Sequence, residues 1–181
     1  MLDIEDSVLI VVDVQSKLSN LMHDHEFLYH NIERFIKVFQ ILQLPIIWTE
    51  QAPDKIGPTV PSIHDLLFPI IKPIAKRSFS AWGCEEFVNQ LLLTKRRQAV
   101  VVGIETHVCI YQTARDLQQH GFEVFVAADA VSSRHQINRD VALSRMRHEN
   151  ITLTTGEAVI CELIRTADHP KFRDVMAHLK R

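Results

Sequence analysis

Three residues of this chain have types and positions that could together support covalent catalysis. Asp13 directly follows the apolar run 8–12, Lys76 follows the extended segment 70–75, and Cys109 comes soon after the apolar run 98–102. A thiol with an ordinary pKa of about 8.5 is mostly protonated at pH 7, so a nucleophilic cysteine needs activation. A neighbouring carboxylate and a lysine ammonium would supply a base and a positive charge.

Each of these residues also has a plainer interpretation. Asp13 could cap a helix or be a buried, hydrogen-bonded carboxylate. A lysine in a loop is usually solvated, and a free cysteine often behaves as a small buried apolar residue. Lys76 is therefore a candidate only in combination with Asp13 and Cys109.

The position of Cys109 distinguishes it from the other two cysteines. Thr106 is a natural N-cap, which would place Cys109 in the first turn of a helix over 106–120. Free backbone N–H groups and the helix dipole at that position would lower the thiol pKa and offer donors to an oxyanion. Cys84 and Cys161 lack such a strand-to-helix turn, and we interpret them as structural.

The apolar periodicity predicts strands alternating with helices. We expect strands at 8–12, 46–49, 98–102, 122–127 and 151–154, and helices at 26–43, 85–93, 106–120 and 138–148, with short helical pieces from 157 and 170. The stretch 50–61 is punctuated by Pro and Gly and is expected to be a loop, with a role as a lid left open. Gly121 is a left-handed cap.

This alternation is typical of an α/β fold. We predict a single domain over residues 1–181, a three-layer α/β/α sandwich with a mainly parallel, Rossmann-like sheet. Ligand sites in such folds lie beyond the carboxyl ends of the strands. Asp13 and Cys109 follow two of these ends.

Composition excludes several classes of partner. The chain has 20 Lys and Arg against 22 Asp and Glu, a formal charge of −2, so we expect no nucleic-acid partner, and we interpret the basic run 95–97 as a solvated loop. No apolar run approaches the roughly 20 residues of a membrane span, and we expect neither a membrane partner nor a signal peptide. The odd number of cysteines, 3, suggests no disulfide framework. We expect a cytoplasmic protein.

Several segments together resemble the isochorismatase-like cysteine hydrolases. They are DVQ at 13–15, Lys76 with FSAW at 79–82, GIETHVC at 103–109 and DAVSS at 129–133. They occur in the order of that family, across nearly the whole chain. The resemblance implies that Cys109 is the nucleophile, Asp13 the proton acceptor and donor, and Lys76 the cation beside both. It also implies a cis peptide at Ile104–Glu105 and an oxyanion hole formed by the backbone N–H groups of Glu105 and Cys109.

The resemblance further implies a reaction and an assembly. We expect hydrolysis of an amide or related C–N bond of a small molecule through a covalent acyl-enzyme, and a homo-oligomer of unstated size. Nicotinamidases of this superfamily carry a metal-binding Asp-x-His after the second strand, where this chain has TEQAP at 49–53. We therefore predict no metal and no cofactor, and a likeness to a compact subgroup whose substrate is not settled.

Residues near the strand ends are candidates for lining the substrate pocket. They are Gln15, Trp48, Phe79, Trp82 and Ile110. His107, two residues before Cys109, is a further candidate for catalysis, although Asp13 already fills the place of the base. Two alternatives remain: a non-catalytic, oligomeric ligand-binding domain of the same fold, and a thiol redox protein, which the lack of Cys-x-x-Cys disfavours.

Overall fold

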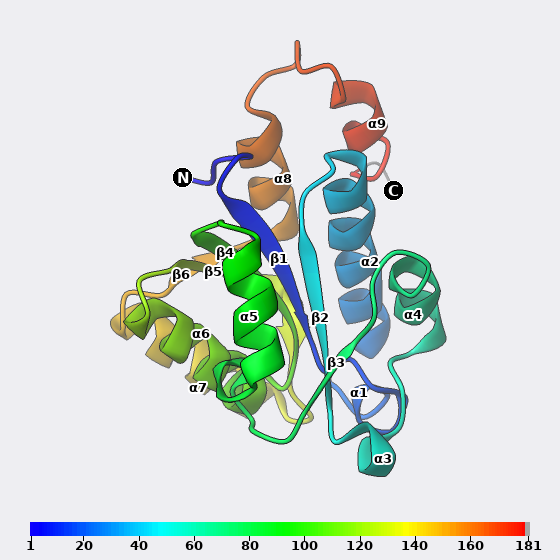
Figure 1. The fold of residues 1–181 in the computed structure, drawn as a ribbon, viewed down its shortest axis with the longest axis vertical. Helices are drawn as coiled ribbons and strands as arrows, with labels where there is room; N and C mark the ends of the chain where they lie inside the picture. The colour runs from blue at the N-terminus through cyan, green and yellow to red at the C-terminus, as the bar shows by residue number, and fades with distance from the viewer. Residues whose placement is uncertain (180–181) are drawn as a thin grey trace.

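A computed structural model describes residues 1–179 of the chain. Its centre is a six-stranded sheet in the order β3-β2-β1-β4-β5-β6, in which every neighbouring pair is parallel (Figure 1). The strands are β1 Ser7–Val12, β2 Ile46–Gln51, β3 Ile74–Lys76, β4 Gln98–Ile104, β5 Glu123–Ser132 and β6 Thr152–Thr154.

Helices cover both faces of this sheet. One face carries α2 His25–Ile41, α4 Pro61–Leu67, α8 Gly156–Ile164 and α9 Phe172–Met176, and the other carries α5 Glu85–Leu93, α6 Tyr111–Gln119 and α7 Gln136–His148 (Figure 1). Two single turns, α1 Ser16–Ser19 and α3 Pro53–Ile56, lie near the carboxyl ends of the strands. The predicted three-layer α/β/α fold with a Rossmann-like parallel sheet is confirmed.

The central strands are apolar because both of their faces are covered. All six residues of β1 are buried. Leu9 and Val11 pack with α2, while Val8, Ile10 and Val12 pack with the layer of α5 and α6. A strand buried on both sides needs a continuous apolar run rather than an alternating one, which is what residues 8–12 provide.

The chain direction across the sheet reverses between β1 and β4. Connections from β1 lead outward to β2 and β3, and those from β4 lead to β5 and β6. Ligands of open α/β folds bind in the crevice at this switch point, beyond the carboxyl ends of the strands. Asp13 and the segment after Ile104 follow these two strands, so the fold brings them to one place.

Gly103 allows β1 and β4 to approach closely at the switch point. It has φ +122°, and a Cβ placed there would lie 2.1 Å from the carbonyl oxygen of Val12. No side chain fits so near a backbone atom, and L residues rarely adopt this φ. Gly103 therefore permits the pairing on which the geometry of the site depends.

Three segments differ from the sequence-based prediction. Residues 50–61, expected to be loop, contain the end of β2 and the turn α3, and the missed helix α4 begins at Pro61. Pro is favoured at the first position of a helix, and two prolines of this stretch, Pro53 and Pro61, start helices. Strand β3 is shorter than predicted, and β5 continues through residues 129–132, past a bulge in its pairing with β4.

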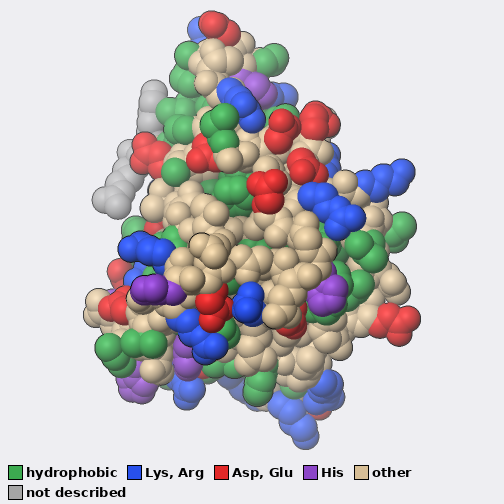
Figure 2. Space-filling view, turned by 90° about the vertical axis from the view of Figure 1, so that its left-hand side faces the viewer, with side chains coloured by type: hydrophobic (Ala, Val, Ile, Leu, Met, Phe, Trp, Pro, Cys, Tyr) green, Lys and Arg blue, Asp and Glu red, His purple; other side chains and the backbone are tan. Residues whose placement is uncertain are grey.

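The remaining helices lie close to their predicted positions, and α5 matches its prediction residue for residue. Gly121, with φ +82°, has the predicted left-handed conformation after α6. Among residues 1–179, no helix is long and apolar enough to cross a membrane. Acidic and basic side chains are interspersed on the face of the molecule drawn in Figure 2.

Candidate active site

Asp13 is buried at the end of β1. Its backbone turns sharply there, with φ +56°, and its N–H donates to the carbonyl of Thr49 at 3.1 Å. The Thr49 hydroxyl donates to Asp13 Oδ1 at 2.8 Å. Asp13 is only 2% exposed, so its carboxylate is fixed in a site with little water. Asp13 does not cap a helix, because it precedes α1 by three residues and makes no capping bond.

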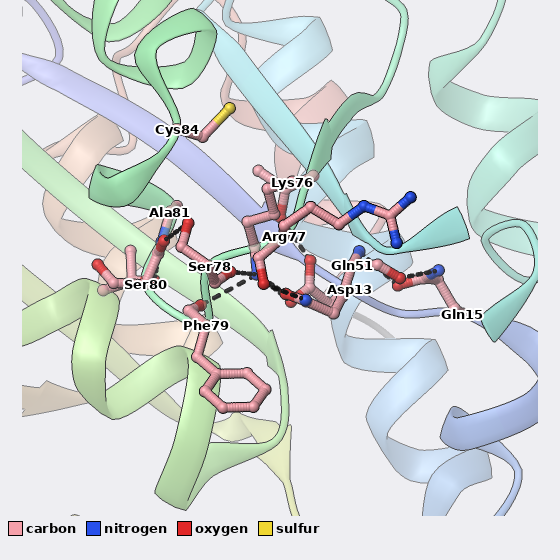
Figure 3. Close-up of polar contacts among 12 residues, drawn as sticks. Asp13, Gln15, Gln51, Lys76, Arg77, Ser78, Phe79, Ser80, Ala81 and Cys84 are labelled. Atoms are coloured by element: carbon pink, nitrogen blue, oxygen red, sulfur yellow. Dashed lines mark hydrogen bonds and ion pairs between the residues drawn. The ribbon is translucent and has the colours of Figure 1, made fainter. Parts of the chain in front are cut away.

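Lys76 reaches the same carboxylate from the end of β3. Its Nζ lies 2.7 Å from Asp13 Oδ2, and both side chains are buried (Figure 3). The ammonium also donates to Gln51 Oε1 at 2.7 Å and to the carbonyls of Ser78 at 3.1 Å and Phe79 at 3.0 Å. Lys76 is therefore part of a buried ion pair and not a solvated loop lysine.

Cys109 lies in a π-helical turn, Thr106–Ile110, that leads into α6. The predicted N-cap is wrong by one residue, because Glu105 occupies the cap position and Thr106 Oγ1 is buried without a partner. The Glu105 carbonyl instead accepts from the N–H groups of Val108 at 3.0 Å and Ile110 at 3.2 Å. The resulting wide turn buries Cys109, which is 7% exposed.

The electrostatics of the site differ from the expectation for Cys109. Burial raises the pKa of the thiol to about 12, and the Asp13 carboxylate adds to this effect while Lys76 opposes it. Burial also raises the pKa of Asp13, against the Lys76 ammonium and the hydrogen bonds from Thr49 and Cys109. The expected lowering of the thiol pKa is therefore wrong for this state, since desolvation outweighs the favourable position in the turn.

The geometry favours a resting state with one positive and one negative charge. Lys76 and Asp13 form the ion pair, and the neutral Cys109 thiol lies beside the Asp13 carboxylate, which adds to the rise of the thiol pKa. Removing the thiol proton to solvent would leave a second, uncompensated negative charge in a buried place. A proton passed from sulfur to Asp13 avoids that cost, because the total charge stays the same.

The peptide bond between Ile104 and Glu105 is cis, as predicted. The Glu105 carboxylate accepts from the backbone N–H of Arg134 at 3.1 Å and from its guanidinium Nε at 3.2 Å. Arg134 lies just after the end of β5. This contact ties the segment before Cys109 to the neighbouring strand. The oxyanion-hole role of the Glu105 and Cys109 N–H groups remains a prediction.

The five predicted pocket residues do not all lie on the side of the sheet that carries Cys109. Trp48 packs in the core on the α2 side of the sheet, opposite the layer of Cys109, and its indole N–H donates to Thr59 at 2.9 Å. Gln15 is buried beside Gln51, where its amide bonds the backbone of Gln51 and of Gly57. Both side chains are therefore engaged in holding the segment after β2.

The other three lie on the Cys109 side of the molecule. Ile110 is fully buried in the core beside α6. Trp82 stacks on His120 at 4.0 Å between ring centroids, toward the far end of α6. Phe79 is 54% exposed, and its ring points away from Asp13 (Figure 3). Of the five, Phe79 is free to meet a ligand without rearrangement.

Several residues of the site were not singled out from the sequence. Thr49 and Gln51 contact the ion pair, and Arg134 holds Glu105. Thr49 and Gln51 could have been identified from the sequence, because they lie at the end of a buried strand, the criterion that selected Asp13. His107 Nδ1 lies 3.0 Å from Ser133 Oγ and its side chain lines a hollow against α7, not the thiol.

Cys109 is buried, and a large cavity of the molecule lies away from it. A cavity of about 630 Å³ lies elsewhere, between α7, β6 and the start of α8, and its lining includes none of Asp13, Lys76 and Cys109. Residues 1–179 contain no group of three or more His, Cys, Asp or Glu side chains arranged to hold a metal. All three cysteines are free, with Cys84 half-buried and Cys161 exposed.

The fold is that of the isochorismatase-like proteins. Residues 7–158 match the model of the isochorismatase domain. The chain is 38% identical over 177 residues to the rat isochorismatase domain-containing protein 2. The aligned region covers 97% of this chain and 82% of the rat protein. The chain therefore belongs to the isochorismatase-domain family.

Solved structures agree with this assignment. The structure of MAR1 ribonuclease from Caenorhabditis elegans matches with a TM-score of 0.93 and 35% identity over 99% of this chain and 92% of its own. YcaC from Pseudomonas aeruginosa, solved with hexane-2,5-diol and covalent acrylamide, matches with a TM-score of 0.90 and 30% identity. The match covers 98% of this chain and 90% of YcaC. YcaC from Escherichia coli, described as an octameric hydrolase of unknown specificity, matches with a TM-score of 0.86 and 30% identity. The match covers 98% of this chain and 95% of that protein.

Proposed function

We propose that residues 1–181 form one cysteine-dependent hydrolase domain that cleaves an amide or related C–N bond of a small molecule. The observation that carries this proposal is the placement of one thiol, one carboxylate and one ammonium at the switch point of the sheet. Asp13 Oδ2 and Lys76 Nζ lie 2.7 Å apart, and the Cys109 thiol lies close enough to Asp13 for the carboxylate to raise the thiol pKa. Family membership supports the general hydrolase class.

The first half of the reaction forms a thioester. Cys109 Sγ attacks the carbonyl carbon while its proton passes to Asp13, so no free thiolate has to form at neutral pH. The carbonyl oxygen becomes an oxyanion, which the backbone N–H groups of Glu105 and Cys109 are proposed to bind. The C–N bond then breaks, Asp13 returns the proton to the leaving nitrogen, and an amine departs.

The second half restores the enzyme. Asp13, again a carboxylate, takes a proton from water as the water oxygen attacks the thioester carbon. The C–S bond breaks, the proton returns to the sulfur, and a carboxylic acid leaves. Lys76 stays protonated throughout and offsets the negative charge, which resides in turn on Asp13 and on the oxyanion.

The covalent acrylamide in the Pseudomonas aeruginosa YcaC structure supports the presence of a reactive nucleophile in a protein of this fold. Acrylamide is a small amide whose activated double bond accepts thiols. The same small, uncharged type of molecule suits a site whose two charges already neutralise each other, as Lys76 and Asp13 do here. We therefore propose a small, neutral amide as the substrate class, with the exposed Phe79 at the entrance.

Two other functions make different predictions. A non-catalytic ligand-binding domain would have an unreactive Cys109. A ribonuclease, the name given to the Caenorhabditis elegans structure, would need cations for phosphate, whereas the only cation placed beside Asp13 among the described residues is Lys76, already paired. We propose a homo-oligomer, supported by the octameric neighbour, and a cytoplasmic location, supported by three free cysteines.

Labelling with iodoacetamide and with acrylamide tests the proposal, with the modified cysteine located by mass spectrometry. We expect Cys109 of the wild type to react faster than Cys84 and Cys161 despite its burial, because Asp13 accepts its proton. Small amides are then screened for release of amine, with Cys109→Ser as the control. If Cys109 reacts no faster than the other two cysteines and no amide is hydrolysed, the non-catalytic domain is the better account. Cleavage of RNA that depends on Cys109 would instead favour the nuclease.

A further inference from the structure

The ammonium of Lys76 is surrounded by more oxygen atoms than it has protons. Four acceptors lie within 3.1 Å of Nζ: Asp13 Oδ2, Gln51 Oε1 and the carbonyl oxygens of Ser78 and Phe79. An ammonium has three N–H donors. Three of the acceptors are neutral, and those three alone are enough to satisfy Lys76.

Gln51 is the only side chain among these neutral acceptors, and its orientation is fixed. Its Nε2 donates to the carbonyl of Arg77 at 2.7 Å, so its Oε1 must face Lys76 (Figure 3). Its backbone is held by Gln15, whose Oε1 accepts from the Gln51 N–H at 2.7 Å and whose Nε2 donates to the Gln51 carbonyl at 3.0 Å. The chain thus holds one amide oxygen rigidly on the cation.

We propose that Gln51 is a positioning residue that keeps the Lys76 ammonium in place while Asp13 changes its protonation state. This inference rests on the proposed function. When Asp13 accepts the proton of Cys109, its negative charge is lost and its attraction for Lys76 falls. Without Gln51 the cation would be free to move away from Asp13, and the ionised carboxylate would lose part of the positive charge that stabilises it. With Gln51 and the two carbonyls, Lys76 keeps all its hydrogen bonds.

The neutral charge of Gln51 is part of this role. A glutamate at the same position would also accept from Lys76, but it would put a second negative charge beside Asp13 and Cys109. Like charges in a buried site raise the pKa of each other. The amide provides an acceptor without that effect, so Asp13 stays available as a base.

The pH titration of the Asp13 carboxyl carbon, followed by ¹³C NMR, tests the inference. Asp13→Asn identifies the signal. The variants are Gln51→Met, which keeps the volume but removes the acceptor, and Gln51→Glu, which keeps the acceptor but adds charge. Thr59→Val is the matched control, because it removes two hydrogen bonds of the same segment without touching Lys76.

We expect the pH midpoint of the Asp13 carboxyl titration to rise in both Gln51 variants. In Thr59→Val it should stay at the wild-type value. We also expect Gln51→Met to slow the alkylation of Cys109 at pH 8 by about 10-fold, the effect of one charge-assisted hydrogen bond. A purely structural role of Gln51 would lower thermal stability without moving the Asp13 midpoint.

A folded Gln51→Met protein whose Asp13 midpoint is unchanged or lower overturns the inference. If Gln51→Met does not fold, Gln51→Ala, which also removes the acceptor without adding charge, decides in the same way. The outcome is separate from that of the proposed function. An unreactive Cys109 in the wild type would remove the hydrolase, whereas the Asp13 titration reports on the coupling of Gln51 and Lys76 whether or not the thiol reacts.

Discussion

Lys76 and Asp13 are paired across an intervening strand. Asp13 follows β1 and Lys76 ends β3, with β2 between them, yet Nζ and Oδ2 lie 2.7 Å apart and the two side chains are 0% and 2% exposed. The long lysine side chain passes the end of β2, where Gln51 also contacts it. Two opposite charges thus share one buried place, and the removal of either leaves the other without its partner.

Lys76→Met should destabilise the protein in a pH-dependent way. Removing one partner of a buried pair costs about 3–5 kcal/mol, because the remaining charge is uncompensated. Burial already raises the pKa of Asp13, and loss of the Lys76 cation would raise it further. The deficit should therefore be largest above that pKa and shrink as the pH falls and Asp13 becomes neutral. Urea unfolding at pH 5 and pH 7.5 measures this. The exposed Lys17→Met is the control and should change stability by under about 0.5 kcal/mol.

Asp13→Asn should separate thiol acidity from turnover. The Asp13 carboxylate helps to raise the pKa of Cys109, and Lys76 lowers it, so replacing the carboxylate by an amide should bring the thiol pKa below about 12. Turnover should nevertheless fall by about 10²–10⁴-fold, because the general base is lost. Thiolate absorbance near 240 nm as a function of pH, beside steady-state kinetics, tests both parts. A higher thiol pKa in the variant would contradict this electrostatic account.

Cys109 should make stability fall at alkaline pH. Its pKa in the folded protein, about 12, lies above the ordinary 9.0, so the unfolded chain loses the thiol proton first as the pH rises. The contribution is fully present below pH 9 and is lost between about 9 and 12, at up to about 1.4 kcal/mol per pH unit. The difference in unfolding free energy between wild type and Cys109→Ser should therefore narrow or reverse from pH 8 to pH 10.5. A constant difference would show that the thiol is not held neutral.

Thr59→Val should loosen the chain around residues 58–61. The Thr59 hydroxyl accepts from the Trp48 indole at 2.9 Å and donates to Glu50 Oε1 at 2.8 Å, and all three residues are buried. Valine keeps the volume but leaves the Trp48 indole N–H unsatisfied and removes one of the two hydrogen bonds to Glu50 Oε1, at a cost of about 1–3 kcal/mol. Hydrogen exchange should be faster at Val60, whose N–H donates to the Val14 carbonyl at 2.9 Å. The exposed Thr152→Val is the control. Equal exchange in wild type and variant would mean that the segment already opens freely.

Gly103→Ala should prevent normal folding. The added Cβ would lie 2.1 Å from the Val12 carbonyl oxygen, in a conformation that alanine rarely adopts. The pairing of β1 and β4 would have to shift, so we expect insoluble protein or a melting temperature many degrees lower. Gly121→Ala is a matched control, since Gly121 also has positive φ, +82°, but a Cβ there meets nothing within 4 Å. Its cost should be about 1–2 kcal/mol. Similar behaviour of the two variants would refute the steric explanation.

The succession of strands and helices along the chain, and the residues at the strand ends, could be predicted from the sequence alone. Apolar runs alternating with amphipathic segments imply a parallel sheet, and in such a sheet the carboxyl ends of the strands meet at one edge. Asp13 and Cys109 were therefore identifiable from their positions after the runs 8–12 and 98–102, and Lys76 by its combination with them. These are local features, which a linear sequence records.

The surroundings of these side chains depended on residues far apart in the chain. A strand that is apolar throughout carries no alternation to indicate its two faces, so Trp48 was expected in the pocket although it lies across the sheet from Cys109. Likewise the turn before α6 suggested an acidic thiol, whereas burial raises the pKa of Cys109 to about 12. Desolvation is the sum of everything packed around an atom, and only the assembled tertiary structure decides it.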